Sequence, residues 1–184
     1  MPQRRHTNPF GRVFWCGVRL GVTGLLVVSA SAMAQGFTAA RLSGQDQTLT
    51  LYTSVGKRIA APVQDGQTGF SQPRLSPGGY YAGWLVMEPN CCTSYPIALR
   101  LVVVNGRQAH HTFSGNGLPI YGWCFADRGT AVVYRQGVLH GSNVLFYQKN
   151  RIRDGKLLAS FEYDEDEHNV PVAPVPAWAR CARP

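Results

Sequence analysis

Short runs of β-branched and aromatic residues alternate with clusters of glycine, proline, asparagine and aspartate along most of the chain. Runs of this length, bounded by turn-forming residues and without helical periodicity, are typical of β-strands. We therefore predict an all-β fold built from antiparallel strands. The expected strands cover residues 48–54, 80–87, 97–104, 120–125, 130–135, 144–148 and 156–163.

The chain also resembles itself at an offset of fifty residues. Residues 49–86 align with residues 99–136 without a gap, and a Gly–basic pair at 56–57 falls on another at 106–107. A strand–Gly–basic element recurs at residues 144–156. Internal repeats of this period are typical of stacked or radially arranged sheets. We therefore expect an antiparallel, four-stranded, blade-like unit of about 50 residues.

Each copy places a tight turn between its first two strands. Proline presets the φ angle of such a turn, and glycine accepts the positive φ that closing it often requires. In the second copy an aspartate replaces the proline and one glycine is kept. The structural turn residues are Ser76, Pro77, Gly78 and Gly79 in the first copy and Asp127 and Gly129 in the second.

The first copy resembles the WD40-like repeats of TolB-type β-propellers, whose blades carry a proline, an apolar residue, Ser-Pro-Asp-Gly and then an apolar strand. Pro73, Leu75, Ser76, Pro77 and Gly79 match that pattern, and Gly78 stands where the family prefers aspartate. The second copy matches chiefly at Trp123, Phe125 and Gly129. The resemblance covers about residues 48–163 and implies blade structure rather than a particular chemistry.

The number of repeats limits the architecture that this resemblance implies. About two and a half repeats are too few for a closed propeller, which typically takes at least about four blades. The sheets would then stack as an open arc, or several chains would assemble to cover their edges. The alternative fold is an ordinary β-sandwich with Gly-rich hairpins.

Residues 1–34 differ from the rest of the chain. A basic lead precedes the apolar run "LGVTGLLVVSA", and Ala32 and Ala34 flank Met33 as small residues flank a signal peptidase site. We predict a cleaved signal peptide over 1–34 and a periplasmic or secreted protein. The alternative is an uncleaved anchor, although Arg19 leaves an apolar run shorter than the ~20 residues that span a bilayer.

Two further segments follow the leader. Residues 35–163 form the expected β-repeat domain, and residues 164–184 form a tail that is first acidic and then rich in proline. Because proline disfavours both helices and central strands, we expect the tail to run extended over the surface, anchored by Trp178.

Charge narrows the range of partners. The full chain carries a net charge of +8, and removing the leader's four arginines leaves 14 basic residues against 10 acidic ones, a net charge of +4. Because no basic stripe stands out, we expect no nucleic-acid partner. Because the leader is expected to be cleaved, we also expect no membrane partner for the mature chain. Exposed sheet edges favour a protein partner or self-association.

The loops suggest where binding occurs. In a blade-like unit, the loop "EPNCCTSYP", the link "TFSGNGLPI" and the loop "GVLHGSN" share one rim of the sheets. Binding residues are usually found on such loops of a rigid β scaffold. The candidate binding residues on this rim are Tyr95, Asn116, His140 and Asn143.

Four cysteines remain after the leader, and an even number in an exported protein indicates disulfides. Cys124 lies about four residues, at ~3.3 Å each, from the rim that holds Cys91 and Cys92, and a bridge needs Cα atoms within about 7 Å. This geometry favours Cys124–Cys181 together with Cys91–Cys92. The competing arrangement joins Cys181 to Cys91 or Cys92.

Motifs for catalysis are missing from the sequence. It contains no Gly-x-Ser-x-Gly elbow, no His-Glu-x-x-His and no Walker loop. Cys91-Cys92 and His110-His111 are adjacent pairs, a spacing unsuited to zinc, so no metal is expected. Because catalytic motifs are missing, no catalytic residue or cofactor is expected either. We predict an exported, non-enzymatic module that binds a protein or ligand. The alternatives are a small secreted hydrolase with His140 as its base and a structural remnant of a larger propeller.

Overall fold

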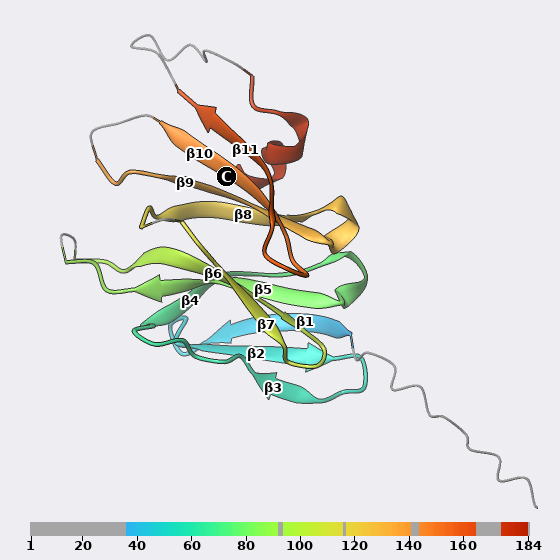
Figure 1. Cartoon of the computed structure of the whole chain (residues 1–184). Helices are drawn as coiled ribbons and strands as arrows, with labels where there is room; N and C mark the ends of the chain where they lie inside the picture. The colour runs from blue at the N-terminus through green and yellow to red at the C-terminus, as the bar shows by residue number, and fades with distance from the viewer. Residues whose placement is uncertain (1–35, 92–93, 116, 141–143, 165–173, 184) are drawn as a thin grey trace, which may run out of the picture. The chain divides into compact units, whose positions relative to one another are not determined.

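The computed structural model describes residues 36–91, 94–115, 117–140, 144–164 and 174–183. Within these ranges, eleven strands form three antiparallel sheets (Figure 1), which confirms the all-β class. The expected signal peptide lies outside the described residues. Among the residues described, no helix is long and apolar enough to cross a membrane.

The first sheet has three strands. They are β1 (Phe37–Ser43), β2 (Thr48–Thr53) and β3 (Arg58–Ala60), in that order across the sheet. Leu49 and Leu51 of β2 are fully buried on one face. On the other face Tyr52 lies between the guanidinium groups of Arg41 and Arg58, 5.4 and 5.7 Å from its ring centroid. One face of this sheet is therefore core and the other is polar.

The second and third sheets have four strands each, connected in the same way. The second contains β4 (Gly69–Leu75), β5 (Tyr81–Glu88), β6 (Ile97–Asn105) and β7 (His110–Ser114). The third contains β8 (Ile120–Ala126), β9 (Ala131–Gly137), β10 (Leu145–Arg151) and β11 (Leu157–Tyr163). Because both sheets follow chain order, the four-stranded repeat is confirmed. At the repeat offset of fifty residues, β2 of the first sheet corresponds to β6 of the second. The first sheet then has no counterpart of β4 among the described residues.

The two predicted turns join the first and second strands of these sheets. Each forms a short 3-10 turn, η1 (Pro77–Gly79) between β4 and β5 and η2 (Asp127–Gly129) between β8 and β9. Gly79 and Gly129 adopt φ angles of 70° and 90°, which a side chain rarely tolerates. The glycines kept in both copies therefore occupy the positions that require them.

The central sheet is buried on both faces, because the first sheet packs on one face and the third sheet on the other. Successive strand residues point to opposite sides and so contribute to different clusters. Trp84 and Val102 pack with Leu49 and Leu51 of the first sheet. Their neighbours Leu85 and Val103 belong to a second core cluster, with Trp123, Val132 and Tyr134 of the third sheet. The three sheets thus form an open stack of blade-like units, compatible with part of a propeller.

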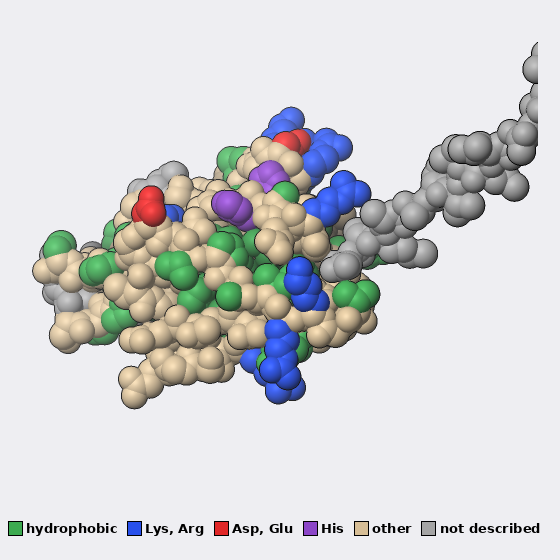
Figure 2. All heavy atoms as spheres, turned by 90° about the horizontal axis from the view of Figure 1, so that it is seen from below, with side chains coloured by type: hydrophobic (Ala, Val, Ile, Leu, Met, Phe, Trp, Pro, Cys, Tyr) green, Lys and Arg blue, Asp and Glu red, His purple; other side chains and the backbone are tan. Residues whose placement is uncertain are grey.

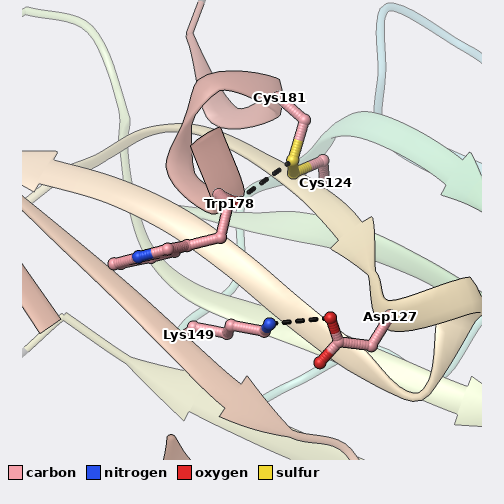
Figure 3. The surroundings of a disulfide bond; sticks show 5 residues. All are labelled: Cys124, Asp127, Lys149, Trp178 and Cys181. Atoms are coloured by element: carbon pink, nitrogen blue, oxygen red, sulfur yellow. Dashed lines mark hydrogen bonds and ion pairs between the residues drawn. A yellow bond between two sulfur atoms is a disulfide. The ribbon is translucent and has the colours of Figure 1, made fainter. Parts of the chain in front are cut away.

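The far face of the third sheet is covered by the C-terminal tail. A 3-10 helix, η3 (Ala177–Ala182), packs there with Val175, Ala179 and Ala182 buried and Trp178 half-buried. The predicted disulfide between Cys124 and Cys181 is confirmed, with Cα atoms 5.9 Å apart (Figure 3).

The expectation of an extended tail is wrong over Ala177–Ala182. The described prolines precede η3, and Pro176 is its N-cap residue, where the missing N–H costs no helical hydrogen bond. The small side chains of Ala179 and Ala182 then allow a tight helix to lie directly on the sheet.

Candidate functional site

Antiparallel connections sort the loops of the three sheets into two ends. We call one the loop end, formed among the described residues by 44–47, 88–91, 94–97, 115, 117–119, 138–140 and 144. We call the other the turn end, formed by residues 54–57, 76–80, 105–109, 127–130 and 152–156. The candidate binding rim corresponds to the loop end. Tyr95 and His140 lie there, whereas Asn116 and Asn143 fall outside the described residues.

A groove of about 360 Å³ opens at the loop end between the second and third sheets. Its walls come from β4, the loop after β5, the start of β8 and the loop after β9. The main contributors are Gln72, Tyr95, Pro96, Ile120, Tyr121 and Leu139. Of the predicted binding residues, Tyr95 lines the groove, and His140 is exposed and directly follows the lining residue Leu139.

Gln72 holds the two sheets together at the base of the groove. Its backbone lies in the left-handed region, with φ of 48°, within an irregularity of the β4–β5 pairing. Its carbonyl accepts a hydrogen bond from the Trp123 indole (3.0 Å), and its side-chain amide donates to the Tyr121 carbonyl (3.2 Å). A strained bulge of this kind is common where a strand edge serves a site. Here it fixes β8 against β4.

The two tyrosines give the groove its chemical character. The Tyr121 hydroxyl donates to the Val138 carbonyl (2.9 Å), which orients its ring. Burial raises the pKa of Tyr121, nearby Tyr95 raises it further, and Arg135 opposes both. The hydroxyl therefore stays neutral at physiological pH. Tyr95 is 55% exposed.

The lining carries no formal charge. None of the described residues that line the groove is aspartate, glutamate, lysine, arginine or histidine. The lining contains the aliphatic side chains of Leu85, Met87 and Ile97 together with hydroxyl and amide groups. An uncharged surface with aromatic rings and a few polar groups suits an uncharged organic ligand.

The other candidate chemistry can be placed only in part. Cys91 is exposed in the loop after β5, and because Cys92 lies outside the described residues, the Cys91–Cys92 bond stays a prediction. In the part of the chain that the structure describes, no three His, Cys, Asp or Glu side chains gather as metal ligands would.

The fold and the site define a class: an open stack of blade-like antiparallel sheets with a groove at one end. No protein family model matches the chain, and no curated protein matches its sequence. The function is therefore argued from this geometry.

Proposed function

We propose that the chain is an exported, non-enzymatic binding module whose groove holds an uncharged saccharide. The observation that carries this proposal is that Tyr95 and Tyr121 both line a groove whose described lining residues carry no charge. Aromatic rings pack against the apolar face of a sugar, while the amide of Gln72 and the tyrosine hydroxyls suit its hydroxyl groups. A charged ligand would find no described partner within the groove.

Export is supported by the leader-like sequence of residues 1–34 and by the Cys124–Cys181 bond. Disulfides persist in oxidising compartments such as the periplasm and the extracellular space. We also propose that the chain is a short relative of WD40-like, TolB-type propellers. The matching residues around η1 and the four-stranded chain-order sheets support this relationship.

The binding proposal can be tested by nuclear magnetic resonance titration of the full chain with maltotriose and with chitotriose. We expect at least one of them to shift the amide signals of Gln72, Tyr95 and Tyr121. Loss of ring stacking in Tyr95→Ala should weaken that binding about three- to tenfold.

Tyr80→Ala is the matched control, because Tyr80 is a comparably exposed tyrosine (64%) that lies at the turn end. It should bind the saccharide as the unchanged protein does. Equal weakening in both variants, or the absence of any shift at the groove with either saccharide, would show that the proposal is wrong.

A further inference from the structure

Basic side chains gather at the turn end, the end opposite the groove. Figure 2 shows lysine and arginine side chains concentrated on the side of the molecule where these turns lie. All three sheets contribute, through turns in which a basic residue stands beside a glycine. The exposed basic residues of these turns and their edges are Lys57, Arg58, Arg107, Arg128, Arg153 and Lys156.

The carboxylates are distributed in the opposite way. Only two described acidic residues lie at the turn end, and both are in ion pairs. Asp127 accepts from Lys149 (2.7 Å, Figure 3), and Asp154 accepts from Arg151 (2.8 Å). The remaining described acidic residues lie at or near the loop end, and they are Asp46, Asp65, Glu88, Glu162 and Asp164. The described basic residues therefore outnumber the acidic ones at the turn end, whereas most described carboxylates lie toward the loop end, where Glu88 is paired with Arg100 (2.7 Å).

Exposed apolar side chains lie among the basic ones. Val55 and Tyr80 are each 64% exposed, in the turns after β2 and β4. Leu157, directly after Lys156, is 49% exposed at the start of β11. A soluble polyanion would be bound by the basic groups alone and would leave these side chains in water. A bilayer surface uses both, because anionic headgroups attract the bases while aromatic and aliphatic side chains enter the interface.

The start of the described chain is at the same end. Gly36 lies against η1, where a Cβ on Gly36 would be 3.4 Å from the Gly79 carbonyl oxygen. The apolar run of the sequence at 20–30 ends a few residues earlier. The described part of the chain therefore begins at the basic end.

We propose that the turn end docks on the surface of an anionic lipid bilayer, with the groove at the loop end directed away from it. The proposal departs from the expectation that the mature chain has no membrane partner, and it concerns a surface separate from the groove. The charge separation orients the protein, and the apolar tips add contact area that salt does not screen.

The test is cosedimentation of the full chain with vesicles of phosphatidylcholine alone and with vesicles in which phosphatidylglycerol replaces part of it. We expect binding to the anionic vesicles to be stronger and to weaken with added salt. In Lys57→Gln/Lys156→Gln, each lost charge should weaken that binding about fivefold. The matched control, Arg180→Gln/Arg183→Gln, has the same net charge but changes only tail residues, and it should bind as the unchanged chain does.

A second pair of variants separates the bilayer from a soluble polyanion. Val55→Ser and Leu157→Ser keep every charge, and each should weaken vesicle binding while leaving binding to heparin unchanged. Equal binding to neutral and anionic vesicles would overturn the proposal, as would equal losses in the two double glutamine variants. If heparin binds tightly and neither serine variant affects vesicles, the partner is a soluble polyanion and the bilayer assignment is wrong. Saccharide titration of the same variants reports on the groove independently.

Discussion

Gly83 of β5 lies where the second sheet packs tightly against Trp123 of the third. A Cβ built on Gly83 would lie 2.7 Å from Cη2 of Trp123 and 3.1 Å from the Val102 carbonyl oxygen. Trp123 is fully buried, and its indole N–H is bound to the Gln72 carbonyl (3.0 Å). The ring therefore cannot turn away from an added methyl group without losing that hydrogen bond. Gly83→Ala should force the sheets apart.

The magnitude follows from these two penalties. Overpacking a well-filled core costs about 1–3 kcal/mol, and losing the indole hydrogen bond costs about 1 kcal/mol more. The lower backbone entropy of alanine in the unfolded chain returns about 0.5–1 kcal/mol. We expect Gly83→Ala to lower the free energy of unfolding by about 1–3.5 kcal/mol.

A double-mutant cycle identifies the cause. Phenylalanine at position 123 lacks the outer ring atom that the new methyl group would strike. Gly83→Ala should therefore cost less than about 1 kcal/mol in the Trp123→Phe background, although Trp123→Phe is itself destabilising. The free energies come from urea denaturation followed by circular dichroism. If Gly83→Ala costs the same in both backgrounds, Trp123 is not what excludes a side chain at position 83, and the reasoning fails.

Three further predictions concern the tail, the core and one hairpin. Cys124→Ala/Cys181→Ala should lower the free energy of unfolding by about 2–4 kcal/mol, since the bond links positions 57 residues apart, and a reductant should destabilise the unchanged protein more than this variant. Burial raises the pKa of Tyr134 to about 12. The stability that the neutral Tyr134 hydroxyl adds to the folded state is complete below pH ~10, the ordinary tyrosine pKa, and is lost as the pH rises toward 12. Urea midpoints should fall over that window, and less so in Tyr134→Phe. The hydrogen bond from Arg151 lowers the pKa of Asp154 to about 2, so the contribution of this carboxylate is lost as the pH falls from about 4 to 2. The Asp154 carboxyl resonance should titrate near that value and move toward 4 in Arg151→Gln.

Local residue choice accounts for the parts of the fold that were predictable. The hairpins follow from prolines and glycines at fixed positions, because backbone conformation at a tight turn depends on the residue itself. Each of the seven predicted strands corresponds to a strand of the structure. The same argument could not reveal β1 (Phe37–Ser43), whose alanines carry little β signal, or the three-residue β3. Both depend on pairing with β2, a tertiary contact that overrides weak propensity.

The site was predictable only as a rim. Connectivity places the loops at one end, which is why Tyr95 could be named. The groove itself also needs Tyr121 and Gln72, and their roles depend on how two sheets meet. One signal for the bulge was present: Pro73 interrupts β4, and proline within a strand indicates an edge or a bulge. Its neighbour Gln72 is the strained residue that bridges to β8.

In a closed propeller each blade is covered on both faces by its neighbours. An open stack of sheets has two outer faces that must be covered in another way. Repeat arrays generally meet this need with a terminal unit whose outer face is polar. The first sheet does this with Arg41, Tyr52 and Arg58 on its outward side. The third sheet instead receives η3, which approaches so closely that a Cβ on Gly122 would be 2.5 Å from the Ala182 carbonyl oxygen. The Cys124–Cys181 bond therefore fastens the segment that covers the outer face of the third sheet.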